Sequence, residues 1–294
     1  MTATITPVSQ HDSATLTRAV AGERMMMDGG ASPLATILQK LADRTDFARD
    51  AVAFGRVEGA CSFSVDAGGS NSSFTVRIGA ISRVVTYRSG TTTYKVFSYA
   101  GGTIGASKIS GGGNLANSDW YFCYAYDNAG TLDFELSTTE PNANLCIKTG
   151  DSTRVYIGCF PTLSTGAPVP LRASRGRYVY RVSGCADADL KVLAGGNQTA
   201  NTAVDCAALV PAHSRLATIR ASVTNTAAAI NYAYVRTEGD SGADEIAISL
   251  TNVNASTANA VFDIETDADQ DIAYRVTANS GAAGLTLWVA GFYE

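Results

Sequence analysis

After about residue 57 the sequence alternates polar and apolar side chains in short runs, and this rhythm limits the possible folds more than any other feature. Such runs, rich in β-branched and aromatic residues and separated by Gly, Ser and Asn, stand at residues 62–65, 74–78, 83–87 and 94–99. A longer run at 120–126 is apolar on both faces, which is typical of a central strand. Because a period of two is the signature of strands, the pattern predicts an all-β fold.

The same rhythm continues in the last third of the chain. Seven further runs occur at residues 190–193, 215–223, 230–236, 245–250, 260–265, 272–276 and 285–293. Their regular spacing, with turn residues between them, is typical of a β-sandwich or a jelly roll. We therefore expect a mainly all-β chain with two β-sandwich or jelly-roll-like domains, at residues 54–183 and 184–294.

Residues 1–53 have a different character. The first 31 residues mix Thr, Ser, Pro and Gly and predict an extended arm, which orders only against a partner. One short α-helix is predicted over about 32–50, with Ser32 as N-cap and Pro33 at the first helical position. Its apolar stripe is formed by Leu34, Ile37, Leu38 and Leu41. This stripe could pack on the chain's own domain, on a second copy or on another protein.

The formal net charge of −5 is unevenly distributed. Residues 1–183 carry 17 basic and 14 acidic side chains, and residues 184–294 carry 5 and 13, which gives +3 and −8. We expect no nucleic-acid partner, because neither part has the dense basic stripe that phosphate binding requires. No apolar run reaches the roughly 18–20 residues of a membrane span, and the N-terminus does not resemble a secretory signal. We therefore expect a soluble protein without membrane insertion.

The six cysteines form no CxxC pair with zinc-ligand spacing. One interpretation makes them small buried thiols within strands. The other makes some of them disulfides formed after release into an oxidising medium, with Cys185 and Cys206 as the first candidate pair because they flank the same loop-like stretch.

No set of residues predicts a reaction centre. The sequence GDSG at 239–242 resembles the nucleophile loop of chymotrypsin-type proteases, but Ser241 follows His213 by only 28 residues, too few for a triad across two barrels. Asp133 and Glu135 share one face of a strand and could be a pair for glycoside hydrolysis, although a solvated strand face explains them more simply. With two histidines in the chain, a histidine-based metal site is not expected, and we expect no enzyme activity and no cofactor.

Two weaker candidates for binding remain. Asp267, Asp269 and Asp271 place carboxylates at alternate positions, as calcium loops do, although a hairpin tip explains them better. Aromatic side chains in strands are mostly expected in the core, and some could stack against sugars. The candidates for a glycan platform are Trp120, Tyr124 and Trp288.

Two stretches resemble virion structural proteins of tailed bacteriophages, of the tail-fibre, appendage and decoration type. The run LQKLADRTDFAR at 38–49 is similar to the short helix, with a leucine-alanine-x-arginine-threonine signature, that often follows the N-terminal arm of such proteins. Between 118 and 182, SDWYFCYAY, NAG, LSTTEP, VYIGCF and RYVYR follow the order seen in β domains near the ends of tail fibres. The long repetitive shaft of many fibres is missing, which favours a compact appendage.

The resemblance implies a structural component of the virion, assembled in the host cytoplasm and located on the tail, baseplate, neck or capsid. Such proteins are commonly homotrimers. The arm and helix would then attach the chain to other virion proteins, and the β domains would face outward for host attachment, with a surface glycan as the partner. The alternatives are a capsid decoration or head-fibre protein, or a carbohydrate-binding module outside any virion.

Overall fold

The computed structural model divides the chain into two compact units, Met1–Phe54 and Gly55–Glu294. The described residues are 3–5, 16–18, 57–58, 62–87, 94–142, 147–174, 176–183, 185–224, 232–240, 246–249, 257–277 and 284–294. They are mostly strands in antiparallel sheets, which confirms the predicted all-β fold. Within these ranges no helix has the length and apolar character needed to cross a bilayer.

In the first unit, β1 (Ala3–Ile5) and β2 (Leu16–Arg18) form an antiparallel pair in which Ile5 is opposite Leu16. The predicted helix lies outside the described residues. This applies to all four positions of its apolar stripe, which are Leu34, Ile37, Leu38 and Leu41.

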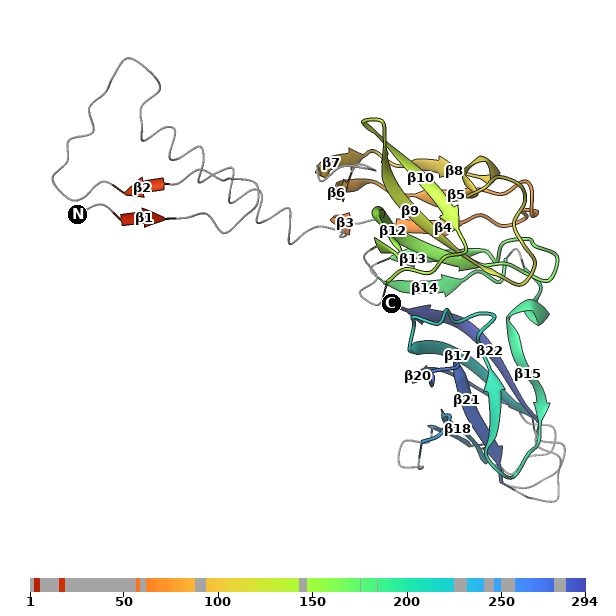
Figure 1. Ribbon diagram of the computed structural model, residues 1–294. Coiled ribbons are helices and arrows are strands. Elements are labelled where there is room, and N and C mark those ends of the chain that lie inside the picture. Colours follow the sequence, from red (N-terminus) through yellow and green to blue (C-terminus); the bar gives the residue numbers. More distant parts are fainter. Residues whose placement is uncertain are drawn as a thin grey trace, which may run out of the picture. The chain divides into compact units, whose positions relative to one another are not determined.

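The second unit begins with two small sheets (Figure 1). One has the order β3-β6-β7, with β3 (Val57–Glu58), β6 (Ile81–Tyr87) and β7 (Tyr94–Tyr99). The other has the order β10-β9-β12-β11, with β9 (Trp120–Asn128), β10 (Thr131–Ser137), β11 (Ile147–Lys148) and β12 (Asp151–Pro161). The β9–β10 hairpin is the predicted one. Ala129 and Gly130 both have positive φ, 50° and 98°, as a two-residue turn that matches the twist of the strands requires.

A nine-stranded sheet is the largest element of the second unit. Its order is β20-β17-β22-β14-β13-β4-β5-β8, and β15 also pairs with β22. The strands are β4 (Ser62–Val65), β5 (Val76–Ile78), β8 (Gly102–Ile104), β13 (Leu171–Ser174), β14 (Arg177–Tyr180), β15 (Lys191–Gly196), β17 (Leu216–Thr224), β20 (Thr257–Glu265) and β22 (Gly284–Tyr293). Two short 3-10 helices lie between strands. η1 (Ala106–Lys108) precedes β9, and η2 (Asp187–Leu190) precedes β15.

This sheet crosses the domain boundary that the sequence predicts between residues 183 and 184. β14 comes before that boundary and β22 after it, yet the two strands are antiparallel neighbours, with Arg177 opposite Tyr293 and Val179 opposite Gly291. Figure 1 shows them side by side. The predicted boundary therefore falls inside one compact unit and inside one continuous sheet.

The remaining sheet has the order β16-β21-β18-β19. Its strands are β16 (Thr202–Asp205), β18 (Tyr232–Thr237), β19 (Ile246–Ser249) and β21 (Asp271–Val276). The sheets pack on one another as layers. Phe63 of the nine-stranded sheet stacks on Phe160 of β12, with ring centroids 6.5 Å apart. One continuous cluster of buried apolar side chains runs through the second unit, so the layers share a core.

Candidate functional site

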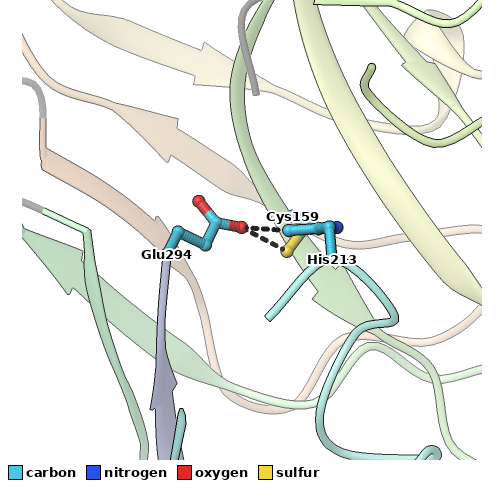
Figure 2. A group of neighbouring side chains, drawn as sticks. All are labelled: Cys159, His213 and Glu294. Atoms are coloured by element: carbon cyan, nitrogen blue, oxygen red, sulfur yellow. Dashed lines mark hydrogen bonds and ion pairs between the residues drawn. The ribbon is translucent and has the colours of Figure 1, made fainter. Parts of the chain in front are cut away.

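A group of polar side chains converges on the carboxylate of Glu294, which follows β22 (Figure 2). Its Oε1 accepts hydrogen bonds from Tyr156 Oη at 2.5 Å and from Cys159 Sγ at 3.3 Å, and lies 2.7 Å from His213 Nε2. Its Oε2 accepts a hydrogen bond from Tyr178 Oη at 2.8 Å. The side chains of His213 and Glu294 are only 8% and 9% exposed, so this is a buried polar centre.

Four segments of the chain bring these residues together. Tyr156 and Cys159 lie on β12, Tyr178 on β14, and His213 on the loop between β16 and β17. The backbone N–H of Glu294 donates to Gly176 O at 2.8 Å, which fixes the end of β22 beside β14. The site therefore depends on the pairing of β14 with β22.

The loop that carries His213 is held by side chains on both of its flanks. Trp120 Nε1 donates to Ala207 O at 2.9 Å, and Tyr180 Oη donates to Leu209 O at 2.6 Å. Ser214 Oγ donates to Tyr293 O at 2.7 Å. These bonds place the His213 imidazole beside two aromatic rings. Its centroid lies 5.7 Å from that of Phe122 on β9 and 6.0 Å from that of Tyr156 on β12.

Burial keeps the donors of this centre protonated. Desolvation raises the pKa of Tyr156, Tyr178 and Cys159 well above their ordinary values, and the Glu294 carboxylate raises all three further. A thiol in this state is a hydrogen-bond donor and a poor nucleophile, because the thiolate is the reactive form. The thiol also donates to the carboxylate, so the arrangement differs from a cysteine activated by a histidine.

The protease-like sequence GDSG does not join this centre in the described structure. Ser241 lies outside the described residues, and His213 is engaged with Glu294. Among the described residues, Cys159, His213 and Glu294 are the one group of three or more potential metal ligands whose ligand atoms all lie within 4.8 Å of one another. The carboxylates of Asp267, Asp269 and Asp271 do not converge in this way, which argues against the predicted calcium loop.

Hydrogen bonds to the backbone account for the turn that holds these aspartates. Asp267 Oδ1 accepts hydrogen bonds from the backbone N–H groups of Asp269 and Asp271, at 2.9 and 2.8 Å. Gln270 adopts a φ of 67° between them. The turn is thus closed by Asp267 itself, as the alternative interpretation of a hairpin tip requires.

A second candidate site lies on the outer face of the nine-stranded sheet. A shallow depression of about 650 Å³ lies over β4, β13 and β14. Its polar lining consists of Ser62, Ser64, Arg172, Ser174, Arg177 and Arg181. Side chains of β13 and β14 point alternately to the core and to the outer face, which explains this lining. The intervening residues Leu171, Ala173 and Tyr178 have their side chains buried in the core. We call this surface the arginine depression.

The arginine depression carries more positive than negative charge. Within the described part of the chain, the side chains of Arg172, Arg177 and Arg181 form no hydrogen bond or ion pair. The Arg177 guanidinium lies over the Tyr293 ring, 5.6 Å from its centroid. Arg77 on the neighbouring β5 is paired with Asp66 at 2.6 Å. Its hydrogen bond, with smaller contributions from the charges of Arg181 and Arg172, lowers the pKa of Asp66, so this carboxylate offsets part of the positive charge.

A third candidate surrounds Trp288, one of the predicted glycan-stacking residues. A depression of about 500 Å³ is lined by Arg220, Ser222, Asn259, Ala260, Val261 and Trp288. The ring of Trp288 is flanked by cations, with Arg220 Cζ 4.3 Å and Lys191 Nζ 5.7 Å from its centroid. Its Nε1 donates to Asp187 Oδ2 at 2.7 Å, and Asp187 also pairs with Arg220. We call this surface the tryptophan depression.

The other two aromatic candidates belong to the structure of the core. Tyr124 is fully buried and its hydroxyl donates to Thr139 O at 2.6 Å, so the expectation that it stacks on a glycan is wrong. Trp120 is half-buried, packs edge-on against Phe292 at 5.7 Å and holds the loop at Ala207. The run at 120–126 is apolar on both faces because both faces are covered, and this leaves little ring surface for a ligand.

The predicted disulfide between Cys185 and Cys206 is also wrong for this structure, because both are free thiols. Cys185 Sγ donates to Arg181 O at 3.4 Å, and Cys206 Sγ donates to Val204 O at 3.7 Å. Each thiol therefore has its own backbone partner. Cys123, Cys159 and Cys206 are buried, as the alternative interpretation of small buried thiols expects.

Asp133 and Glu135 do share one face of β10, but that face is not simply solvated. Asp133 is bound by Lys108 Nζ at 2.5 Å, and Glu135 by Lys148 Nζ at 2.6 Å and Arg154 Nε at 2.8 Å. The side chain of Glu135 is only 14% exposed. Because each carboxylate is neutralised by its own cations, the pair resembles a structural ion network more than an acid and base waiting for a sugar.

Comparison of the sequence with known protein families and with curated proteins found no match. Sequence reasoning identified Trp288 but missed the arginine depression and the centre around Glu294. The alternation of Arg172, Ser174, Arg177 and Val179 with core residues was the signal that could have placed these arginines on one outer face.

Proposed function

We propose that this chain is a structural component of a phage virion, a compact appendage attached by its N-terminus, and that it binds an anionic glycan of the host surface through the arginine depression. The observation that carries the binding role is the group of three arginines on an open sheet face, whose side chains form no hydrogen bond or ion pair among the described residues. The proposed role requires no chemical step on the bound glycan.

The chemistry of the arginine depression suits acidic sugars. A guanidinium presents a planar fork of N–H groups that pairs with a carboxylate or sulfate through two parallel hydrogen bonds. The hydroxyl groups of Ser62, Ser64 and Ser174 line the same surface and can donate to or accept from sugar hydroxyls. Exposed Val179 supplies an apolar patch beside them. An acidic sugar carries a negative charge, hydroxyl groups and an apolar ring face, and the depression offers a complementary group for each.

A nucleic acid is the competing anionic partner. Proteins that bind duplexes typically neutralise about 6–10 phosphates, whereas this depression offers three arginines. The net charge of −5, with −8 on residues 184–294, repels a long polyphosphate. Three arginines are enough for one or two acidic sugar units, so the glycan is favoured.

The virion role rests on the resemblance of residues 38–49 and 118–182 to phage appendage proteins. The first stretch lies outside the described residues, and the second forms β9 to β14, including the β9–β10 hairpin. A mainly β body with open sheet faces is compatible with outward display. A homotrimer attached through residues 1–53 would present three copies of the arginine depression and strengthen a weak single-site interaction.

The binding role is tested with a sulfated polysaccharide and with neutral dextran of the same length, by calorimetry on the full chain. We expect binding of the sulfated polymer that weakens with salt, and no binding of dextran. The variant Arg172→Ala/Arg177→Ala should weaken binding by about tenfold or more, because each charged hydrogen bond contributes about 1.5–3 kcal/mol.

Arg172→Ala alone removes one positive charge from the depression. Its matched control is Arg275→Ala, which removes one positive charge from β21, where Arg275 lies over the ring of Tyr234. It should bind the sulfated polymer as the wild type does. Equal weakening by both variants would indicate a nonspecific charge effect and contradict the assigned surface. Tighter binding of duplex DNA than of the sulfated polymer would favour the nucleic-acid alternative.

The anchoring role has its own test. Phage particles assembled with a chain that lacks residues 1–50 should contain none of it, whereas particles assembled with the Arg172→Ala/Arg177→Ala variant should contain normal amounts. Normal incorporation of the truncated chain would refute attachment through the N-terminus. This result would leave the glycan-binding assignment to be judged by its own experiment.

A further inference from the structure

We infer that Cys159, His213 and Glu294 form a binding site for a zinc ion, which ties the end of β22 to β12 and to the loop that carries His213. The three ligand atoms come from separate segments and lie within 4.8 Å of one another in the interior of the second unit. Figure 2 shows the three side chains pointing toward one another. This inference does not depend on the glycan-binding role or on the virion role.

Three potential hydrogen-bond donors crowd around Oε1 of Glu294. This oxygen lies 2.5 Å from Tyr156, 3.3 Å from Cys159 and 2.7 Å from His213. A carboxylate oxygen has two lone pairs, so three hydrogen bonds exceed its usual capacity. The same convergence of sulfur, nitrogen and oxygen is what ligands adopt around a shared cation.

The distances from Glu294 to Cys159 and to His213 are near those between ligand atoms around zinc. Zinc bonds of about 2.0–2.3 Å in tetrahedral geometry place neighbouring ligand atoms roughly 3.5 Å apart. The contact between Cys159 and Glu294 is already 3.3 Å, and that between His213 and Glu294 would lengthen from 2.7 Å by less than about 1 Å. The ligand atoms of Cys159 and His213 lie within 4.8 Å of each other and would approach by up to about 1.3 Å. The Tyr156 hydroxyl, or a water molecule, would occupy the fourth position.

The chemical type of the three ligands favours zinc over other cations. One thiolate, one imidazole and one carboxylate form a borderline-soft set that suits zinc and does not suit calcium or magnesium. In the metal-free arrangement His213 Nε2 faces Glu294 Oε1 at 2.7 Å; with zinc on Nε2 the imidazole proton would be on Nδ1, which is buried and has no partner among the described residues. Tyr178, which donates to Glu294 Oε2, would orient the carboxylate from outside the metal.

Metal binding here requires the loss of one proton. The Cys159 thiol donates to Glu294 in the metal-free arrangement, and as the sulfur–zinc bond forms, its proton passes to the buffer. The charge of the zinc ion is then balanced by the thiolate and the carboxylate. No electron is transferred. His213 Nε2 and the Glu294 carboxylate bind through lone pairs, and the neutral imidazole keeps its one proton on Nδ1.

The test uses the full chain, freed of metal with a chelator and then titrated with zinc chloride in two buffers of different ionisation enthalpy. We expect one zinc ion per chain and the release of about one proton. Cobalt(II) in place of zinc should give a thiolate-to-cobalt charge-transfer band in the near ultraviolet. Zinc should also raise the melting temperature, because it binds the folded state.

The decisive variant is Cys159→Ala, compared with Cys206→Ala, which removes another buried thiol that lies outside this group. The first should lose the cobalt band and weaken zinc binding at least tenfold, and the second should keep both. His213→Gln provides a second ligand deletion that leaves the thiol in place. Circular dichroism establishes that each variant is folded.

Four results would overturn the site. Three of them are the absence of zinc binding by the folded wild type, a cobalt complex without the thiolate band, and equal weakening by Cys159→Ala and Cys206→Ala. Retention of full affinity by folded His213→Gln would remove the histidine from the site and overturn it as stated.

Discussion

The rings of Tyr178 and Phe292 stack in parallel, with their centroids 4.4 Å apart and their planes 10° apart. Tyr178 belongs to β14 and Phe292 to β22, so the stack joins the two parts that the sequence predicts to be separate domains. Trp120 and Tyr180 pack on the same Phe292 ring, at 5.7 and 6.1 Å. Phe292 is fully buried and is therefore a link between the two parts of one core.

Phe292→Ala should destabilise residues 55–294 as a whole. Replacing a fully buried phenylalanine by alanine costs about 3–5 kcal/mol, through lost burial and the cavity that remains. Denaturant unfolding, followed by tryptophan fluorescence and by circular dichroism, should show one transition at a lower midpoint. Val261→Ala is the control, since Val261 is 67% exposed, and should change stability by less than about 0.5 kcal/mol. Two separate transitions, of which only one moves, would contradict the shared core.

Gly291→Ala should break the pairing of β14 with β22. A Cβ atom on Gly291 would lie 2.0 Å from the backbone oxygen of Tyr178, far inside van der Waals contact. We expect a loss of about 2 kcal/mol or more, as for other severe steric clashes in a core. Gly284→Ala on the same strand is the matched control, because its Cβ meets only Gly195, at 3.5 Å. Equal stability of the two variants, measured by urea unfolding, would refute the close approach at Gly291.

Glu135 should make the stability of the second unit depend on pH in the acid range. Burial alone would raise the pKa of Glu135, but hydrogen bonds and charges from Lys148 and Arg154 outweigh it and lower the pKa below its ordinary 4.5. A carboxyl whose pKa is lowered by folding stabilises the protein above its unfolded pKa, and this contribution is lost as the pH falls through the folded value. The free energy of unfolding should therefore decrease below about pH 4.5.

Glu135→Gln tests that assignment. It should cost about 1.5–3 kcal/mol at neutral pH, the range for hydrogen bonds to charged groups, and it should flatten the acid dependence. Unfolding in urea at several pH values below neutrality measures both effects. An acid dependence in the variant as steep as in the wild type would assign the effect to other carboxylates.

Asp187→Asn should increase the affinity for the sulfated polysaccharide. Asp187 pairs with Arg220 and accepts from Trp288, and these hydrogen bonds hold its pKa below its usual range, so it is negative at neutral pH. Removing this charge leaves Arg220 and Lys191 uncompensated beside the ring. We expect an increase of about 1.5- to 5-fold that disappears at high salt, as for exposed charge pairs. No change at low salt would separate the tryptophan depression from the binding surface.

Local pattern predicted part of this structure. The β9–β10 hairpin was predictable because alternation and the turn residues at 127–130 lie within one short segment. The pairing of Arg177 with Tyr293 was not, because it joins residues more than a hundred positions apart and neither strand carries a local signal for its neighbour. For this reason the sequence suggested two domains where one sheet continues.

The site around Glu294 escaped prediction for the same physical reason. His213 was considered only with Ser241, its apparent partner in sequence, whereas its partner in space is Glu294. The sequence pattern places Tyr156 and Tyr178 at inward positions of strands, and a buried tyrosine hydroxyl needs a hydrogen-bond acceptor. They do not indicate which acceptor, because the acceptor comes from another segment of the chain.

The arginine and tryptophan depressions lie on one face of a single backbone ladder. Arg177, Tyr293 and Leu216 are cross-strand partners on that face, and Arg220 follows Leu216 on β17 with the same parity. From β13, which carries Arg172, to β17, which carries Arg220, there are three interstrand steps, roughly 14 Å across the sheet. Main-chain hydrogen bonds join these strands, with one register irregularity at Thr218 and Ile219, and so set the spacing of the two depressions. A polymer whose acidic groups recur at a commensurate interval would engage both at once, and its repeat length would become a basis for selection.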